Sequence, residues 1–236
     1  TERLFAITGL TGFIAAHAAA QLLARGDRVR GTVRSLAKAE GNARLIGLPG
    51  AAERLEIIEA ELLTEGSYDR AMAGVETVFH MASPYSLEFK DAQRDLVDPA
   101  VKGTLNVLAA CARSPSVKRV VLTSSMAAVT DEPDGRVLTE ADWNTKSSLT
   151  RNPYYFAKSE GERAAWAFME REKPAFDLVV INPFLVIGPS LTPGLNTSNQ
   201  IIVEALTGVF PAIMQLNWGM VDVRDVALAH ILAADN

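Results

Sequence analysis

Two residues in the second half of the chain have the spacing that acid catalysis requires. Tyr154 and Lys158 stand at i and i+4 in the segment YYFAK, so a helix places both side chains on one face. A free phenol has a pKa of about 10, which makes tyrosine a poor proton donor at neutral pH. A nearby ammonium group and the N-terminus of a helix both favour the phenolate. Tyr154 is therefore predicted to protonate a carbonyl oxygen, although the motif alone is common by chance.

A run of hydroxyl side chains follows one predicted strand. Thr123, Ser124 and Ser125 close the segment VVLTSS, at the end of the fifth predicted strand. A hydroxyl at this edge of a parallel sheet can hydrogen-bond a substrate carbonyl and share the charge that develops on its oxygen. Strand-end serine and threonine residues also cap the following turn without any catalytic role. Because Tyr154 and Lys158 are present, we predict that Ser125 is the third catalytic residue.

A glycine turn joins the first predicted strand to the first predicted helix. Gly9, Gly12 and Ala15 form the pattern G-x-x-G-x-x-A in LFAITGLTGFIA. The first glycine allows a tight turn, the second lets a pyrophosphate approach the backbone, and the small third residue lets the helix lie close to the strand. Free N–H groups at the helix N-terminus then face the phosphates. The turn is predicted to bind a dinucleotide, and the alternative is a purely structural turn.

The end of the second strand distinguishes between the two nicotinamide cofactors. An enzyme that uses NAD needs an acidic residue there to hold the ribose 2′-hydroxyl. This chain has Arg34 at that point, in RVRGTVRS, and no acid before Glu40. A guanidinium can bind a 2′-phosphate in a fork, so Arg34, with Lys38 beyond it, favours NADP(H). The alternative is that Arg34 is a solvated surface residue.

Apolar strand patterns alternate with helical patterns through most of the chain, which predicts a doubly wound parallel α/β sheet of the Rossmann type. Asn152 is expected to cap the helix that carries Tyr154, with Pro153 in its first turn. The expected strands are 3–8, 28–33, 55–59, 77–82, 119–124 and 178–182, and the expected helices are 12–25, 36–45, 67–72, 93–113, 154–172, 199–206 and 223–234.

The alternation of strand and helix patterns ends after Asn182, where Gly and Pro cluster in GPSLTPGLN. We therefore divide the chain into a dinucleotide-binding domain over 1–182 and a small substrate lobe over 183–236. Open α/β sheets bind ligands at the carboxyl ends of their strands, which is where this lobe is expected to lie. The apolar segments around 184–220 favour a hydrophobic carbonyl substrate. Candidate pocket walls are Tyr85, Met126, Phe184, Leu185 and Trp218.

Composition excludes several other classes of protein. The chain has 236 residues, 48% of them hydrophobic, and a net charge of −5, with no basic run that would attract nucleic acid. No residue spacing suggests a metal site. No apolar run approaches the roughly 20 residues of a membrane span. The single cysteine, Cys111, allows no internal disulfide and is expected to be a core residue. We expect a cytoplasmic protein.

The ordered motifs together resemble one known family. TGLTGFIAAH, GTVRS, VFHMASP, VKGTLNVL, TSSMAAV, YYFAK, INPFLVIGPS and VDVRDVALAH occur in that order over nearly the whole chain. The sequence resembles an extended short-chain dehydrogenase/reductase, in the branch of dihydroflavonol 4-reductase-like and yeast-type aldehyde (ketone) reductases. Relatives in this family continue beyond the point that matches Asn236, so the substrate lobe is expected to be incomplete.

The resemblance assigns site residues by position. It implies catalysis by Ser125, Tyr154 and Lys158, with Lys158 also holding the nicotinamide ribose. Glu61 and Leu62 stand where the family has the Asp-Leu that contacts adenine, so Glu61 is a departure from the pattern. Histidines His17 and His80 are expected to pack or hydrogen-bond rather than act as bases. The expected cofactor-binding set is Gly9, Thr11, Gly12, Phe13, Ile14, Arg34, Lys38, Glu61, Leu62, Ala82, Tyr154, Lys158 and Pro183.

The resemblance implies NADPH-dependent reduction of an aldehyde or ketone to the alcohol, with Tyr154 as proton donor and a small-molecule carbonyl as the partner. A homodimer through the helices at 93–113 and 154–172 is implied as well. Two alternatives remain open. One is a nucleotide-sugar epimerase or dehydratase with bound NAD, which Arg34 and the MAA sequence after Ser125 disfavour. The other is a non-catalytic NADP-binding sensor, a class that commonly lacks the Tyr/Lys pair.

Overall fold

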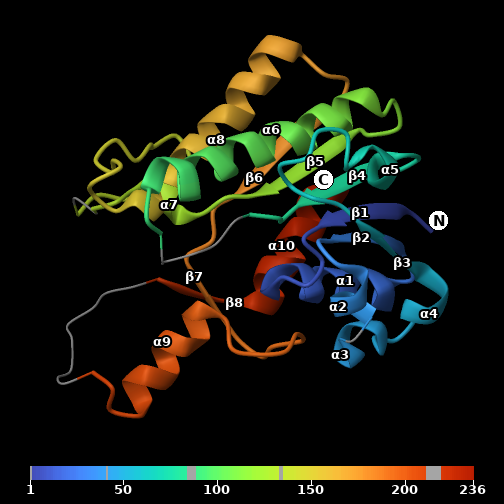
Figure 1. The fold of residues 1–236 in the computed structure, drawn as a ribbon, viewed down its shortest axis with the longest axis horizontal. Coiled ribbons are helices and arrows are strands. Elements are labelled where there is room, and N and C mark those ends of the chain that lie inside the picture. Colours follow the sequence, from blue (N-terminus) through green and yellow to red (C-terminus); the bar gives the residue numbers. More distant parts are fainter. Residues whose placement is uncertain (1, 41, 84–88, 133–134, 211–218) are drawn as a thin grey trace.

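The core of the protein is a six-stranded parallel sheet, seen in a computed structural model that describes residues 2–40, 42–83, 89–132, 135–210 and 219–236 (Figure 1). The strand order is β3-β2-β1-β4-β5-β6. The first three strands are therefore added in one direction from β1, and β4, β5 and β6 are added on its other side. This order confirms the predicted doubly wound Rossmann sheet. The strands are β1 (Leu4–Thr8), β2 (Arg28–Val33), β3 (Leu55–Glu59), β4 (Thr77–His80), β5 (Arg119–Thr123) and β6 (Asp177–Ile181).

Helices cover both faces of this sheet, which explains why its central strands are apolar on successive residues. On one face, α1 (Phe13–Arg25) and α10 (Val223–Asp235) pack against each other. Four alanines of α1 are buried there and let the helix lie close to the strands: Ala15, Ala16, Ala18 and Ala19. The other face carries α5 (Asp69–Met72), α6 (Asp98–Arg113) and α8 (Pro153–Glu172).

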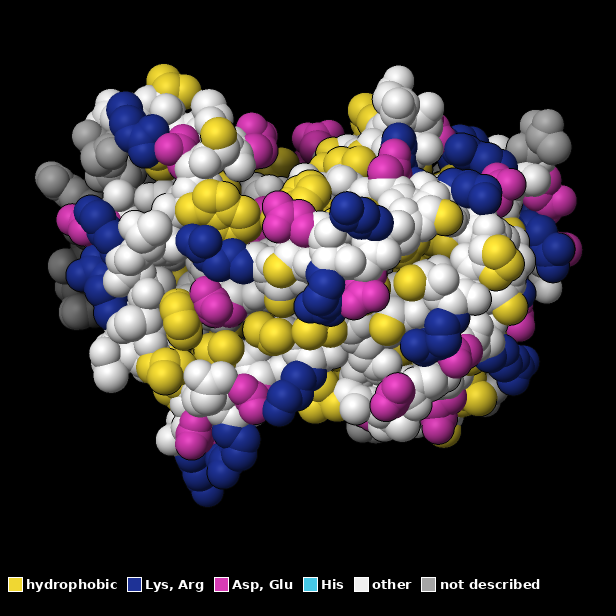
Figure 2. All heavy atoms as spheres, turned by 90° about the horizontal axis from the view of Figure 1, so that it is seen from above, with side chains coloured by type: hydrophobic (Ala, Val, Ile, Leu, Met, Phe, Trp, Pro, Cys, Tyr) yellow, Lys and Arg dark blue, Asp and Glu magenta, His cyan; other side chains and the backbone are white. Residues whose placement is uncertain are grey.

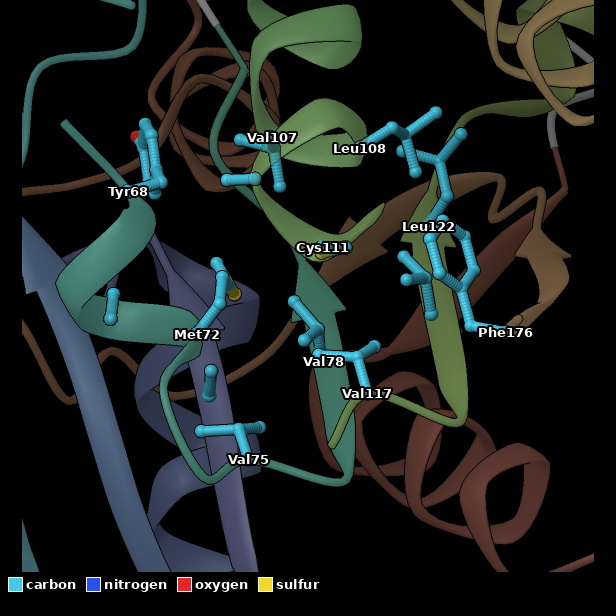
Figure 3. Close-up of a cluster of buried hydrophobic side chains, with 14 of the residues drawn as sticks. Tyr68, Met72, Val75, Val78, Val107, Leu108, Cys111, Val117, Leu122 and Phe176 are labelled. Atoms are coloured by element: carbon cyan, nitrogen blue, oxygen red, sulfur yellow. The ribbon is translucent and has the colours of Figure 1, made fainter. Parts of the chain in front are cut away.

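The core beneath α5 and α6 contains the single cysteine. Cys111 is fully buried among Met72, Val78 and Leu108 (Figure 3). Burial raises the pKa of its thiol to about 12. Cys111 is therefore a protonated core residue, as predicted.

The helices at 36–45 and 93–113 are less regular than predicted. The first is divided into α2 (Leu36–Glu40) and α3 (Ala43–Ile46), because Asn42 accepts a hydrogen bond from Leu45 N and starts a new helix. The second begins as a π-helical segment, η1 (Gln93–Val97), and continues as α6. Two short helices that the sequence did not predict are α4 (Ala51–Arg54) and α7 (Met126–Val129).

The tail after Asn182 forms a small layer and then returns to the sheet. Strands β7 (Leu185–Ile187) and β8 (Met220–Asp222) pair in parallel, next to α9 (Thr197–Leu206). The following helix, α10, packs on α1 and β5, and its residues Ala227 and Ile231 belong to the main core. The boundary expected at residue 183 is therefore crossed by packing, and the division into two domains stays a prediction.

The face above α6 and α8 mixes acidic and basic side chains, with hydrophobic ones between them (Figure 2). This face presents no extended region of one charge. None of the helices in the described parts of the chain is long and apolar enough to cross a membrane.

Candidate active site

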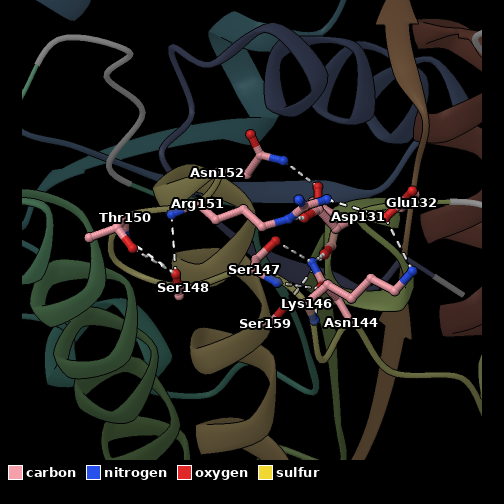
Figure 4. A network of polar contacts seen from close by, with 11 residues as sticks. Asp131, Glu132, Asn144, Lys146, Ser147, Ser148, Thr150, Arg151, Asn152 and Ser159 are labelled. Atoms are coloured by element: carbon pink, nitrogen blue, oxygen red, sulfur yellow. Dashed lines mark hydrogen bonds and ion pairs between the residues drawn. The ribbon is translucent and has the colours of Figure 1, made fainter.

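Helix α8 carries Tyr154 and Lys158 in its first two turns. Pro153 occupies the first turn, as predicted. The predicted cap by Asn152 is wrong, because Asn152 has left-handed backbone (φ 49°) and its side chain makes no cap hydrogen bond. Its amide donates instead to the carboxylate of Asp131, which also accepts from Arg151 Nε at 2.9 Å (Figure 4). The Asp131 side chain is almost fully buried and needs these donors more than the helix end does.

Lys158 connects the helix to the carboxyl edge of the sheet. Its Nζ atom lies 5.8 Å from the centroid of the Tyr154 ring and donates to Ser83 Oγ, just after β4, at 3.1 Å. Burial lowers the pKa of Lys158 to about 8. The side chain is therefore still mostly a cation at neutral pH, and the expected Tyr–Lys pair is brought together.

The neighbouring phenol has a different environment. Burial, together with the carboxylate of Asp131, raises the pKa of Tyr155. A phenol in that position resists ionisation, which makes Tyr155 a weaker proton donor than an ordinary tyrosine. The structure therefore distinguishes the two adjacent tyrosines, with Tyr154 beside the cation and Tyr155 beside the anion.

Ser125 lies in the turn between β5 and α7. Its backbone is extended, and its Oγ accepts a hydrogen bond from Ala127 N at 3.2 Å, so it caps α7. The capping role considered from the sequence is thus present. The cap uses a lone pair of the oxygen, and the hydroxyl hydrogen can still be donated to a substrate. Capping and the predicted catalytic role are compatible in this geometry.

The ends of β5 and β6 are held together next to Ser125. Ser124 N donates to Ile181 O at 2.9 Å, and Met126 N donates to Pro183 O at 3.0 Å. Pro183, one of the expected cofactor-binding residues, therefore lies at the carboxyl end of β6, next to the Ser125 turn.

The glycine turn has the conformation that its residues predict. Gly9 has φ +70°, and a side chain there would lie 3.0 Å from the Cα atom of Ala82. Gly12 N donates to Gly9 O at 2.8 Å and closes the turn. Thr8, which the sequence reasoning did not consider, accepts hydrogen bonds from Met81 N and Ala82 N through its hydroxyl. Gly9 is therefore required for the close approach of β1 and the segment after β4.

The beginning of α1 fits a phosphate. Thr11 and Gly12 are exposed, no described side chain caps the first turn, and that turn contains no acidic residue. The side chains of Phe13 and Ile14 pack toward Val186, so these two residues would offer a phosphate their backbone N–H groups. A helix N-terminus with this geometry suits a pyrophosphate.

The expected adenosine ligands are spread along the neighbouring strand ends. Arg34 is exposed directly after β2, while the side chain of Lys38 lies outside the described residues. Glu61 is exposed and accepts from Leu62 N at 3.0 Å. The side chain of Leu62 packs on Gly103 of α6. The exposed position of Arg34 at the end of β2 is compatible with the predicted 2′-phosphate contact, which stays a prediction.

The two histidines weighed from the sequence are hydrogen-bonding residues, as predicted. His17 Nε2 lies 2.8 Å from Pro189 O. His80 Nδ1 lies 2.9 Å from Thr8 Oγ1, and because that oxygen already accepts two N–H groups, the hydroxyl donates to the ring. Burial and the nearby charge of Lys158 lower the pKa of His80 to about 3. His80 is therefore neutral near pH 7 and supports the turn at Thr8.

The candidate pocket walls are only partly described. Tyr85 and Trp218 lie outside the described residues. Phe184 is 52% exposed and packs over Gly219, and Leu185 follows it in β7. Met126 is partly buried at the start of α7.

Known proteins with the same features fall in one family. Residues 5–236 match the NAD dependent epimerase/dehydratase family. The chain belongs to this family. The resemblance to extended short-chain dehydrogenases/reductases drawn from the motifs is thereby confirmed.

Several relatives of this chain are named as reductases. A cinnamoyl-CoA reductase, CAD2, from Medicago truncatula is 46% identical over 241 residues, covering 98% of this chain and 72% of the relative. A tetraketide alpha-pyrone reductase from Arabidopsis thaliana is 39% identical, covering 98% of this chain and 74% of the relative. The solved structure of Gre2 from Candida albicans, in complex with NADPH, is 36% identical, has a TM-score of 0.87, and is matched over 99% of this chain and 75% of that chain. Almost the whole length of this chain is thus similar to oxidoreductases.

Proposed function

We propose that this chain catalyses the NADPH-dependent reduction of an aldehyde or ketone to the alcohol. The observation that carries the proposal is the placement of Lys158, whose ammonium lies 5.8 Å from the Tyr154 ring and hydrogen-bonds Ser83 at the edge of the sheet. This edge is where open α/β sheets bind their ligands. The reductase names of two relatives support the same reaction class, and the NADPH complex of Gre2 supports the cofactor.

NADPH, when bound, supplies the hydride for this reaction. The glycine turn and the uncapped start of α1 suit its pyrophosphate, and exposed Arg34 suits its 2′-phosphate. The residues proposed to hold it are those expected from the sequence: Gly9, Thr11, Gly12, Phe13, Ile14, Arg34, Lys38, Glu61, Leu62, Ala82, Tyr154, Lys158 and Pro183.

The chain's own residues manage the proton and the charge on the carbonyl oxygen. Tyr154 donates its phenolic proton to that oxygen as the alcohol forms. The Lys158 cation stabilises the phenolate that remains on Tyr154. The Ser125 hydroxyl donates a hydrogen bond to the same oxygen and orients the carbonyl. Because Ser125 also accepts from Ala127 N, its oxygen is held in one position.

A hydrophobic carbonyl is the proposed substrate class. The segments after β6 and α9 and the β7–β8 layer expose several large apolar side chains, of which Phe184 follows Pro183 at the carboxyl end of β6, and we propose that this apolar surface would contact an aliphatic or aromatic substrate. These side chains are Phe184, Leu195, Leu206, Val209 and Met220.

The test is NADPH oxidation over a panel of aliphatic and aromatic aldehydes and ketones, with NADH alongside. We expect oxidation of NADPH with at least one carbonyl and slower oxidation of NADH. Tyr154→Phe should lower kcat by about 10²–10⁴ and leave NADPH binding nearly intact, because only the phenolic oxygen is lost and the other proposed NADPH-binding residues remain. Tyr155→Phe is the matched control and should keep most of the activity. Binding of NADPH without oxidation by any carbonyl would favour a sensor, and NAD that copurifies with the protein would favour an epimerase.

A further inference from the structure

A third side chain lies on the face of α8 that carries Tyr154 and Lys158. Glu162 follows Lys158 by four residues, and its side chain is buried, with the residue only 8% exposed. Its Oε2 atom accepts from Asn182 Nδ2 at 2.8 Å, and its Oε1 atom accepts from Trp166 Nε1 at 3.3 Å. A buried carboxylate with two neutral donors is costly, so its retention requires a reason.

The amide of Asn182 connects this carboxylate to the turn that holds Ser125. The same Nδ2 atom that donates to Glu162 also donates to the backbone carbonyl of Ser125, at 3.2 Å. The next residue, Pro183, accepts from Met126 N at 3.0 Å. The peptide group between Ser125 and Met126 is therefore held on both sides by residues 182 and 183.

These contacts set the distance between α8 and the turn that holds Ser125, the two elements that carry the proposed catalytic residues. The NH₂ group of an asparagine has two hydrogens in a fixed plane, so its two acceptors keep a fixed separation. The bond to the carboxylate is charge-assisted and is the stronger of the two. Asn182 is thus fixed by α8 through Glu162, and it transmits the position of α8 to the Ser125 turn.

We propose that Glu162 and Asn182 are positioning residues that place Ser125 relative to Tyr154 and Lys158. The inference rests on the proposed function, since it concerns the geometry of that reaction. Groups that act on one carbonyl oxygen must be held closely, and a misplacement of about 1 Å can cost about 10²-fold in rate. Neither Glu162 nor Asn182 itself is required to touch the reactants.

The alternative role for Glu162 is electrostatic, in which its charge acts on the Lys158 cation. Glu162, Lys158 and Ser124 line one small cavity between β5, α6 and α8. A carboxylate acting on the Lys158 cation would change the pH dependence of the reaction when its charge is removed. Glu162→Gln removes the charge but retains an oxygen that can accept from Asn182. If Glu162 acts by positioning, Glu162→Gln should keep most of the wild-type kcat and an unchanged pH profile.

The decisive experiment is a double-mutant cycle with Ser125→Ala, measured as the rate of hydride transfer in single turnovers. We expect Glu162→Ala and Asn182→Ala each to lower the rate about 10–100-fold in the wild-type background, because the Ser125 hydroxyl is misplaced. In the Ser125→Ala background, where no hydroxyl remains to be placed, each should cost less than about 3-fold. NADPH affinity should not change. Equal losses in both backgrounds would overturn the proposal.

The matched control is Glu160→Ala, on the same helix but in a partly exposed ion pair with Arg163. It should leave the rate unchanged. Hydrogen exchange of the backbone amides of 124–128 gives a readout that needs no activity: Glu162→Ala, Glu162→Gln and Asn182→Ala can each be compared with Glu160→Ala. Faster exchange in Glu162→Ala and Asn182→Ala supports the positioning role, and unchanged exchange in both refutes it. A wild-type protein that reduces no carbonyl would refute the proposed function, while the exchange result would still decide the link between α8 and the turn.

Discussion

At the scale of single residues, the site depends on burial and neighbouring charges, which give chemically similar side chains different properties. Lys158 Nζ lies 5.8 Å from the centroid of the Tyr154 ring, while burial, together with the carboxylate of Asp131, raises the pKa of Tyr155. His80, next to the same cation, stays neutral because burial and the charge of Lys158 both lower its pKa. The sequence predicted that Tyr154 meets Lys158, but it could not show that Tyr155 lies near Asp131, because these two residues are more than 20 positions apart.

Lys158 is predicted to reduce the stability of the protein without cofactor. Its folded-state pKa is about 8, below its ordinary value of 10.5, because burial penalises the charged form. Below pH 8 the lysine is charged in both states and the folded state carries the full penalty. As the pH rises from 8 to 10.5 the folded state loses its proton first, so the free energy of unfolding increases over that range.

Lys158→Met should therefore abolish carbonyl reduction and stabilise the protein at pH 7. We expect a gain on the order of 1 kcal/mol, or roughly 2–4 °C in Tm, after allowance for partial solvent exposure and the lost bond to Ser83. The gain should shrink as the pH approaches 10. The measurement is thermal unfolding of both proteins without cofactor at pH 7 and pH 10. A variant that is less stable than wild type at pH 7 would contradict this cost of burial.

Arg34 is predicted to determine the preference for NADPH over NADH. Arg34→Ala should weaken NADPH binding by about 10–100-fold, the loss of a charge-assisted pair with the 2′-phosphate, and should leave NADH binding unchanged. Arg28→Ala is the control, because Arg28 is an exposed arginine at the other end of the same strand. Fluorescence titration of both cofactors measures the effect. Equal losses for NADPH and NADH in Arg34→Ala would show that Arg34 does not contact the 2′-phosphate.

At the scale of elements, the regular strands and helices of the sheet followed from the sequence, while the short elements did not. Apolar runs bounded by turn residues predicted β2 and β3 with their observed bounds and the other four sheet strands within two residues at each end. Helices α4 and α7 have four residues each, too few for a periodic pattern. Strands β7 and β8 have three residues each and pair across more than 30 residues, which local sequence cannot reveal.

The same limit applies to the site. The Tyr154–Lys158 pair was predictable because both residues share one helix face. The contacts from Lys158 to Ser83 and from Asn182 to Ser125 join residues that are 75 and 57 positions apart. Asn152 was wrongly assigned as a cap because its preference for helix N-termini was overridden by the buried carboxylate of Asp131.

The glycine turn gives a prediction about element packing. Gly9 and Gly26 both have positive φ, at +70° and +93°, but a Cβ atom meets the backbone of Ala82 only at Gly9, and nothing lies within 4 Å at Gly26. Substitution by alanine should cost each site about 1–2 kcal/mol for the left-handed backbone. Gly9→Ala should cost about 1–3 kcal/mol more, because β1 and the segment after β4 must separate. Urea unfolding of the two variants measures the difference, and equal losses would contradict the close approach.

At the scale of the whole molecule, the tail after Asn182 is fastened to the sheet by its last helix. His230 in α10 lies 2.7 Å from Thr123 Oγ1 at the end of β5, and its other ring nitrogen lies 2.7 Å from Val226 O. This buried histidine fixes the last helix to the strand that leads into Ser125. The residues after 182 therefore help to hold the end of β5 next to Ser125, while their contribution of apolar surroundings to the site stays a prediction. A homodimer through α6 and α8 stays a prediction.

The most direct test of the proposed reaction is to follow the transferred hydrogen itself. NADPH in which both hydrogens at C4 of the nicotinamide are replaced by deuterium is incubated with the protein and a hydrophobic aldehyde, and the alcohol is analysed by mass spectrometry. We expect one deuterium on the former carbonyl carbon with the wild-type protein, and almost none in the same time with Tyr154→Phe. Alcohol without deuterium, or equal transfer by Tyr154→Phe, would contradict a reduction in which Tyr154 donates the proton.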